Sequence, residues 1–351
     1  MATTVSALLG QYPTNPVKNT LKHSDSNKSW AKSYPPISRL RVHTSIQGPG
    51  SVIANFNDAF LGEYNDETLR LNETAHPPNY RRWRLDSEED GIQWFHTEIS
   101  NVVLSAFASH PSLLQTSHEK ALSETRTEQT VDISYSVSHG KERMPVAIGE
   151  FKRGLIKPEQ WQNGKLIHSQ QIILSQELRG YAHKYACPQV FCFDNYSFLM
   201  LQFRARNKHD IKDAKCDVDC WILPREDMHG CYSTTLRYAL YRLLVQGFRR
   251  CQGARPMEVS LYGIHPHVRE FYNGQPLWKI DGKLHTQPGG HCRLVDPTCG
   301  AFFWTDSDGS TPLLDQDGNV ARDTEEFWES SQQQTEPDNN ILAGEDLYGP
   351  G

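Results

Sequence analysis

No stretch of about 18 consecutive apolar residues occurs in the 351-residue chain, so we expect no membrane-spanning helix. The first residues lack a basic segment followed by a long apolar run, and we therefore expect no secretory signal. No Walker or Rossmann glycine pattern is present, which argues against nucleotide-driven chemistry. Cys187 and Cys192 carry no flanking catalytic histidine motif, which argues against a thiol hydrolase. Since we expect neither a secretory signal nor a membrane span, we expect the eight cysteines to be reduced, in the nucleus or cytoplasm.

The net charge of -6 hides an uneven distribution of charge along the chain. Between residues 306 and 346, twelve acidic residues accompany one basic residue, Arg322. Subtracting these from the totals of 36 basic and 42 acidic residues leaves 35 basic against 30 acidic. A mildly basic body with an acidic tail suits a polyanion-binding protein, although an acidic tail equally suits a segment that only solubilises.

Composition divides the chain into three parts. Residues 1–50 are rich in Ser, Thr, Asn and Pro, and we predict them to be disordered. Residues 51–304 indicate one α/β domain, with 255–304 forming a C-terminal cap rich in Gly, Pro, His and aromatic residues. Residues 305–351 are acidic, Gln-rich and poor in apolar residues, which predicts a disordered tail.

Apolar periodicity predicts the elements of the domain. Apolar residues recur at three- and four-residue steps, which predicts helices, at 88–109, 167–185 and 233–250. Short apolar runs bounded by turn residues predict strands at 130–137, 145–151, 190–193 and 196–203, with a further strand at 217–223. This order is typical of a mixed β-sheet flanked by helices.

The first two strands predict a hairpin that carries acidic residues. If the hairpin is centred on Lys141, Asp132 lies across from Glu150, because each is nine positions from Lys141. Directly opposite residues share a face, with Cβ atoms about 5 Å apart. Lys152 follows Glu150 by two residues, so it projects from the same face. Two carboxylates so close repel each other, which predicts a site for a divalent cation.

The order of these residues resembles the PD-(D/E)XK nuclease superfamily, which has the restriction-endonuclease-like fold. That superfamily places a Glu on a helix, an Asp on the next strand, E-x-K on the following strand and often a Gln on the next helix. Over residues 88–205, these places are held by Glu98, Asp132, Glu150-Phe151-Lys152 and Gln176. Val131 stands where the superfamily usually has Pro before the Asp.

The resemblance implies hydrolysis of phosphodiester bonds in DNA or RNA with Mg²⁺ or Mn²⁺. Asp132 and Glu150 would hold the ion, and Glu98 would bind it directly or through water. Lys152 would orient or deprotonate the attacking water, and Gln176 would position water or phosphate, or fix Lys152.

Two other interpretations of the same residues remain open. In the first, the domain keeps the nuclease-like fold without catalysis and binds nucleic acid or a protein partner. In the second, the cluster is structural, with Lys152 paired to Glu150 and Asp132 capping a turn. The nuclease predicts metal-dependent cleavage, the inactive module predicts binding without cleavage, and the structural cluster predicts neither.

A basic and aromatic segment precedes the first predicted helix. Tyr80 and the run Arg81, Arg82, Trp83 and Arg84 form a candidate nucleic-acid contact. Contacts of this kind to phosphates supply affinity rather than sequence choice. Arg242, Arg249 and Arg250 on the third predicted helix form a second candidate, for which an ordinary solvated helix face is an equally good interpretation.

Overall fold

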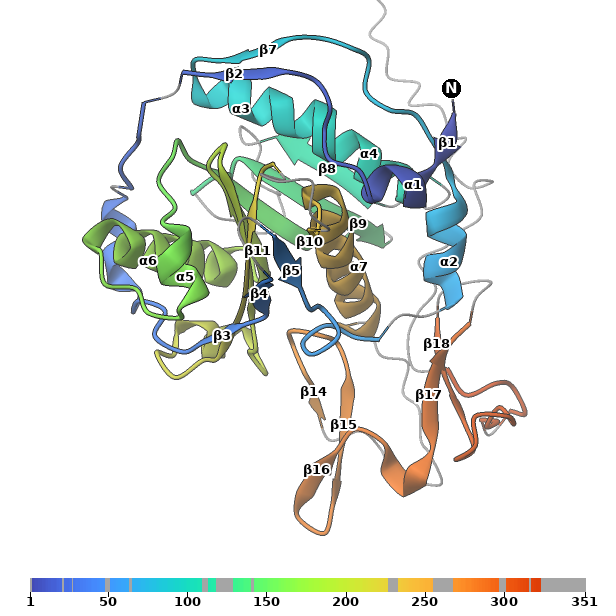
Figure 1. The fold of residues 1–351 in the computed structure, drawn as a ribbon. Helices are drawn as coiled ribbons and strands as arrows, with labels where there is room; N and C mark the ends of the chain where they lie inside the picture. Colours follow the sequence, from blue (N-terminus) through green and yellow to red (C-terminus); the bar gives the residue numbers. More distant parts are fainter. Residues whose placement is uncertain are drawn as a thin grey trace, which may run out of the picture.

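The computed structural model describes residues 2–322 except 21, 27, 48–50, 63–64, 109–112, 118–128, 140–141, 227–232, 255–267, 297–300 and 316. These residues form a mixed α/β fold in which helices cover both faces of a seven-stranded sheet (Figure 1). The predicted fold class is therefore confirmed at the level of a mixed sheet flanked by helices.

The strands of the main sheet lie in the order β3-β13-β12-β11-β10-β9-β8. Their bounds are Leu40–Val42 (β3), Leu113–Ser117 (β8), Ile133–His139 (β9), Glu142–Phe151 (β10), Gln189–Phe193 (β11), Ser197–Phe203 (β12) and Val218–Pro224 (β13). β8, β9 and β10 are antiparallel neighbours, and β11 runs parallel to β10. All five predicted strands are present, and β3 and β8 are two strands that the periodicity did not indicate.

Helices on one face run almost end to end. They are α3 (Glu88–Phe95), the π-helical turn η2 (His96–Ser100), α4 (Asn101–Leu104) and the short η3 (Ser105–Phe107), joined on the same face by α7 (Leu236–Ala254). Ser87 begins α3 through a capping box with Asp90, which satisfies backbone donors at the helix start. The opposite face carries α5 (Pro158–Gln162) and α6 (Ser169–Lys184), and α6 is the crossover between parallel strands β10 and β11.

Side chains of β10 and β11 alternate between two apolar clusters. Phe151 and Phe193 pack against Phe95 on the α3 side, while Ile148 and Cys192 belong to the cluster under α6. Because successive side chains of a strand point to opposite faces, the residues on either side of Phe151 point toward α6. This alternation places the Glu and Lys of the E-x-K sequence on the α6 side of the sheet.

The prediction of disorder for residues 1–50 is wrong for much of that segment. It contains β1 (Thr3–Thr4), α1 (Val5–Leu9), β2 (Val17–Asn19), η1 (Ser29–Ser33), β3 and β4 (Thr44–Ile46). Several of its apolar side chains pack on the domain, since Val5, Leu8 and Leu9 enter the core, and β3 pairs with β13 at the sheet edge. Low apolar content therefore did not mean disorder, because these residues dock on a core built by the rest of the chain.

Small elements link this segment to the domain. β1 pairs with β6 (Thr74–Ala75), β2 with β7 (Trp83–Leu85), and β4 with β5 (Val52–Ala54). The short helices α2 (Asn65–Asn72) and η5 (Lys208–Lys212) complete this part.

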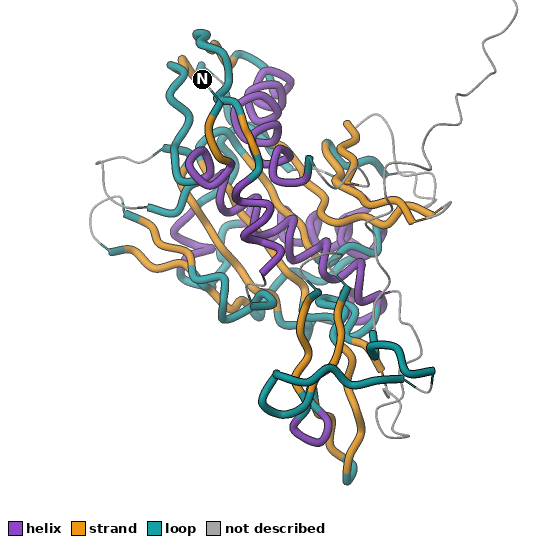
Figure 2. Tube along the Cα trace, turned by 90° about the vertical axis from the view of Figure 1, so that its right-hand side faces the viewer, coloured by secondary structure: helices purple, strands orange, loops and turns teal. Residues whose placement is uncertain are grey.

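The C-terminal cap projects from one end of the domain in both views (Figures 1 and 2). It contains β14 (Val268–Arg269), β15 (Pro276–Ile280), β16 (Lys283–His285), η6 (Pro288–Gly290), β17 (Cys292–Val295) and β18 (Phe302–Thr305). Trp278 and Trp304 meet edge to face at 4.8 Å between ring centroids and form its small core with Ala321.

The predicted disorder from residue 305 on is wrong up to residue 322. Isolated bridges join Thr305 to Pro312, Leu314 to Val320 and Phe303 to Arg322, so this stretch folds back on β18. Its apolar residues Leu313 and Ala321 pack against the paired tryptophans, which compensates for the acidic surroundings. Residues 323–351 of the predicted tail lie outside the described residues.

Candidate active site

Asp132 and Glu150 are neighbours across the β9–β10 hairpin. Near the turn, Glu142 pairs with His139 and Pro145 with Ser136, but beyond a bulge at Val146 the register shifts by one, and Gly149 pairs with Ile133. One step further, Asp132 stands beside Glu150, and its backbone N–H donates to the Gly149 carbonyl oxygen over 3.1 Å. The Oδ2 atom of Asp132 accepts a hydrogen bond from the Phe151 N–H at 2.6 Å.

Lys152 binds two buried carboxylates. Its Nζ atom lies 2.5 Å from Glu150 Oε1 and 3.1 Å from Glu177 Oε1, a residue of α6. Burial opposes the positive charge, but the two carboxylates outweigh burial and hold the pKa of Lys152 above its usual range. Lys152 therefore stays protonated across the pH range in which proteins work.

The pKa values of the two carboxylates in this cluster shift in opposite directions. Burial raises the pKa of Glu150 to about 8, an effect that Lys152 opposes and Asp132 reinforces. Burial acts in the same direction on Glu177, but Lys152, Ser26 and Lys28 together hold its pKa below the ordinary value. The Oε2 atom of Glu150 is buried and has no hydrogen-bond partner within the described ranges. Glu177 therefore neutralises Lys152, and Glu150 keeps an oxygen available.

A segment from the N-terminal region covers the cluster. Lys28 Nζ lies 3.2 Å from Glu150 Oε1, 3.5 Å from Glu177 Oε1 and 2.7 Å from the Tyr181 hydroxyl. Ser26 donates its hydroxyl to Glu177 Oε2. This N-terminal cover, the described residues 22–33 apart from 27, brings a second ammonium to the carboxylates.

Glu88, rather than Glu98, is the helix acid that interacts with this cluster. Glu88 is in the first turn of α3, and burial followed by the charge of Asp132 raises its pKa, whereas Lys152 and Arg153 lower it. In the sequence, the start of this helix is marked by Ser87 followed by three consecutive acidic residues. This signal could have identified Glu88.

Glu98 takes part in a separate buried network. Its Oε1 atom accepts hydrogen bonds from Asn15 Nδ2 and Trp83 Nε1, both at 2.7 Å, and Arg237 lies 4.0 Å from Oε2. The prediction that Glu98 joins Asp132 and Glu150 is wrong, because within the described ranges its side chain bonds to the N-terminal segment, β7 and α7. The apolar stripe correctly identified the helix but not which acid along it reaches the sheet edge.

Gln176 is also outside the cluster. Its Nε2 atom donates to the Tyr34 carbonyl oxygen at 2.8 Å, so it ties α6 to the N-terminal segment. Glu177, one residue later, lies three residues after Leu174 and four before Tyr181, and all three are buried. This spacing places a carboxylate on the apolar face of α6, a signal in the sequence that could have identified Glu177.

The predicted nucleic-acid segment is mostly on the surface. Arg81, Arg82 and Arg84 are exposed, and the Arg81 guanidinium lies 5.3 Å from the Trp83 ring. Trp83 is only half-buried, but its indole N–H is committed to Glu98. The second candidate is wrong, because Arg242, Arg249 and Arg250 are all at most 4 % exposed and pack inside the domain.

Among the residues that the structure describes, no group of three or more His, Cys, Asp or Glu side chains is arranged to hold a metal ion. Mg²⁺ commonly takes one or two carboxylates and keeps several waters, so Asp132 and Glu150 with its free Oε2 fit such an ion in residue type. Lys28 and Lys152 occupy one side of Glu150 as cationic partners.

Within the described ranges, no helix has the length and apolar character needed to cross a membrane. No family model, no curated protein and no solved structure matches this chain.

Proposed function

We propose that this chain is a metal-dependent nuclease that hydrolyses phosphodiester bonds in DNA or RNA, on a restriction-endonuclease-like core. That core would comprise the helix from α3 to η3, strands β8 to β11 and helix α6. The observation that carries the proposal is the side-by-side placement of Asp132 and Glu150 at one edge of the sheet, with Lys152 on the face of Glu150. The antiparallel meander followed by a helical crossover to a parallel strand supports the fold.

Asp132 and Glu150 would hold Mg²⁺ or Mn²⁺ through carboxylate oxygens. A bound ion would lower the pKa of a water molecule and neutralise charge on the scissile phosphate. Glu150 must be deprotonated to serve as a ligand, and the buried Oε2 that lacks a partner in the described structure is the oxygen suited to that role. Glu88, at the start of α3, would add negative charge near the site rather than a ligand, because Asp132 and Lys152 both shift its pKa.

Lys152 would act as a fixed positive charge and hydrogen-bond donor rather than as a general base or a general acid. Its ammonium is held protonated by Glu150 and Glu177, so it cannot readily accept a proton from water. A fixed positive charge next to the phosphate would stabilise the negative charge that grows on the phosphoryl oxygens. Glu177 is a positioning residue, because it holds the ammonium from the α6 side.

Exposed arginines would hold the nucleic acid. Arg81, Arg82 and Arg84 lie on β7 and the loop before it, and β7 leads directly into α3, which begins with Glu88. Neutralising phosphates with these side chains would give an affinity that falls with salt.

The test is cleavage of plasmid, linear duplex, single-stranded DNA and RNA by the full chain with Mg²⁺, with Mn²⁺ or with EDTA. We expect metal-dependent cleavage by the wild type and a loss of about 100-fold or more in Asp132→Asn and Glu150→Gln, because each removes a carboxylate charge at the ion. Glu98→Gln is the matched control on the same scaffold. Equal cleavage by wild type, Asp132→Asn and Glu150→Gln would reject the nuclease assignment.

Lys152 allows a structural role to be separated from a catalytic one. Lys152→Met alone leaves buried carboxylates without their cation, which costs about 3–5 kcal/mol in the free energy of unfolding. Adding Glu177→Gln removes one of those charges without changing a proposed metal ligand, and should recover part of that loss. Recovered stability with cleavage still absent supports catalysis, whereas recovery of both would assign the cluster to structure alone.

A second candidate is a nucleic-acid-binding module without turnover. The observation that favours it is the pair of ammonium groups already within 3.2 Å of Glu150 Oε1, as a structural salt-bridge cluster would have them. Asp132 also accepts a backbone N–H, as a capping residue would. This candidate predicts salt-dependent binding that needs no metal and yields no products.

A further inference from the structure

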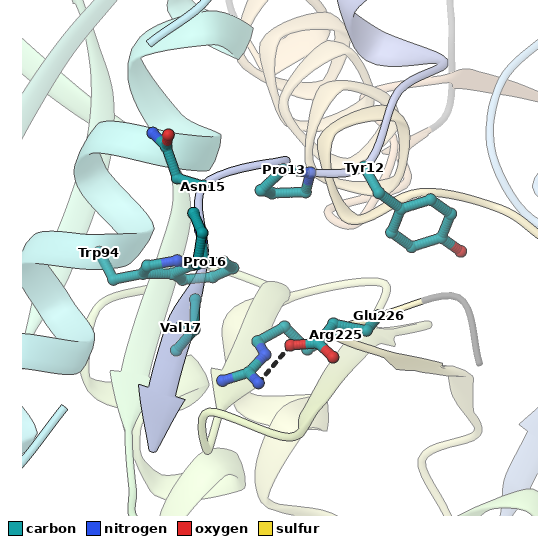
Figure 3. Close-up of a pocket in the computed structure, with 8 residues that line it drawn as sticks. All are labelled: Tyr12, Pro13, Asn15, Pro16, Val17, Trp94, Arg225 and Glu226. Carbon is teal, nitrogen blue, oxygen red and sulfur yellow. Dashed lines mark hydrogen bonds and ion pairs between the residues drawn. The ribbon is translucent and has the colours of Figure 1, made fainter. Parts of the chain in front are cut away.

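A separate pocket lies at the same edge of the sheet, on the opposite face. It has a volume of about 340 Å³ and is lined by residues 12–17 of the N-terminal segment, by α3 and by the residues that follow β13 (Figure 3). The side chains that carry unpaired polar groups into this part of the structure are Trp94 and Arg225. Trp94 stacks on Phe193 at 5.5 Å between centroids, so the pocket opens on the α3 side, away from Glu177 and Lys152.

Arg225 brings an incompletely paired guanidinium to this pocket. The residue is 8 % exposed, and its Nε and Nη1 atoms are buried without a hydrogen-bond partner in the described parts of the chain. Within the described ranges only Nη2 is paired, with Glu226, whose side chain is 63 % exposed. A guanidinium has five N–H donors, so Nε and Nη1 leave three of them unused. Burying such donors without an acceptor is unfavourable, and a ligand that accepts them would remove that cost.

Trp94 adds a further donor. Its Nε1 atom is buried and likewise has no partner among the described residues, and the Arg225 guanidinium lies 5.7 Å from its ring. One ring face is occupied by Phe193, so the indole offers its N–H rather than a free stacking surface. The unused groups on these two residues are therefore all donors.

We propose that this pocket binds a phosphate monoester, with Arg225 and Trp94 donating to its oxygens. Three features favour phosphate. A phosphate has several acceptor oxygens, whereas a single carbonyl oxygen could not accept all the unpaired N–H groups of Arg225 and Trp94. A phosphate also carries the negative charge that a guanidinium binds best. A volume of about 340 Å³ also leaves space beyond the phosphate for the group that carries it.

The phosphate could belong to a free nucleotide or to the end of a nucleic-acid strand. The binding chemistry is the same for both, and the proposal stands independently of phosphodiester hydrolysis at Glu150. Isothermal titration would use a nucleoside 5′-monophosphate, the matching nucleoside, and one oligonucleotide with and without a 5′-phosphate. EDTA throughout removes any contribution from a divalent cation.

Arg225→Met is the main variant, because it keeps the length of the side chain and removes its donors and charge. We expect the monophosphate or the phosphorylated strand to bind the wild type and to lose about ten-fold or more in affinity in Arg225→Met, as for loss of a charge-assisted hydrogen bond. Trp94→Phe, which keeps an aromatic ring and removes the N–H, should weaken binding about five-fold. Arg206→Met removes an equal charge from an exposed position and should bind as the wild type does.

The comparison of ligands identifies the source of the phosphate. Tighter binding of the phosphorylated strand than of the monophosphate assigns the pocket to strand ends, and equal binding assigns it to free monophosphates. No phosphate-dependent binding, or an affinity that Arg225→Met leaves unchanged, would overturn the proposal. Asp132→Asn should bind the phosphate ligands as the wild type does, because Asp132 is outside this pocket. Loss of cleavage in that variant can therefore be told apart from loss of phosphate binding in Arg225→Met. Thermal unfolding of each variant confirms that a loss of binding is not a loss of folding.

Discussion

Asp132 stands beside Glu150 because β10 contains one residue more than its partner strand between Pro145 and Ala147. Without the bulge at Val146, the register of the turn would continue and Asp132 would face Gly149 instead. A slip of one residue sends a side chain to the other face of a sheet, so the two carboxylates would point away from each other. The bulge therefore determines whether this sheet edge has an acidic pair.

The bulge is held from the α7 side, which leads to a first prediction. A Cβ atom at Gly247 would lie 2.0 Å from the Val146 carbonyl oxygen, so Gly247→Ala forces β10 and α7 apart. We expect a loss of about 1–3 kcal/mol in the free energy of unfolding, measured by urea denaturation. Gly62→Ala is the control, because nothing lies within 4 Å of its added Cβ. Equal stability of the two variants would mean that the bulge is not held by this contact.

The adjacent pair Gln176 and Glu177 supplies a second prediction. Glu177→Gln removes the buried carboxylate that neutralises Lys152, so we expect lower cleavage and a loss of stability of about 3–5 kcal/mol. Gln176→Ala removes one hydrogen bond to the Tyr34 carbonyl and should cost only about 1 kcal/mol. Cleavage assays and chemical denaturation of both variants test whether Glu177→Gln has the larger effect. A larger loss of cleavage in Gln176→Ala would show that Gln176 belongs to the site after all.

Lys28 leads to a third prediction, about access to the site. Its ammonium lies against the same Glu150 oxygen as Lys152, so it competes electrostatically with a divalent cation there. Lys28→Ala removes the contact between this ammonium and Glu150, so it should lower the Mg²⁺ concentration needed for half-maximal cleavage by about two- to ten-fold. The effect is modest because the Lys28 side chain is 39 % exposed and its charge is partly screened by water. Lys32→Ala, an exposed lysine in η1, is the matched control. An unchanged or higher Mg²⁺ requirement in Lys28→Ala would contradict competition at Glu150.

His183 gives a prediction for pH. Burial, reinforced by Lys212, Lys208, His209 and Lys184, lowers the pKa of His183 to about 4. The unfolded chain, with a histidine pKa of about 6.5, therefore binds a proton that the folded chain does not. The stability that His183 contributes is present above about pH 6.5 and is lost as the pH falls toward 4.

The measurement is the melting temperature of wild type and His183→Gln between pH 4 and 7. The variant should lose less stability on acidification, and the difference should shrink at about 1 M salt because the lysine contribution is screened. Parallel pH profiles for the two proteins would show that His183 is not protonated on unfolding.

Local spacing predicted a large part of this protein. The separation of Glu150 and Lys152 by one residue was enough to place them on one face, with Phe151 in the core on the other side. Apolar periodicity likewise identified α6, α7 and strands β9 to β13. These features depend on the repeat of a single element, which each stretch of residues carries within itself.

The partners that complete the site were decided by tertiary structure. Glu177 rather than Gln176 contacts Lys152, and the charges of Asp132 and Lys152 act on Glu88, whereas Glu98 bonds to Asn15 and Trp83. A helix turns by about 100° per residue, so its packing on the sheet decides which side chain faces the cluster. Lys28 comes from more than 100 residues away in the chain, and no local pattern marks it. The pairing of Asp132 with Glu150 needed both: hairpin symmetry about Lys141 suggested it, and the bulge at Val146, held against Gly247, made it so.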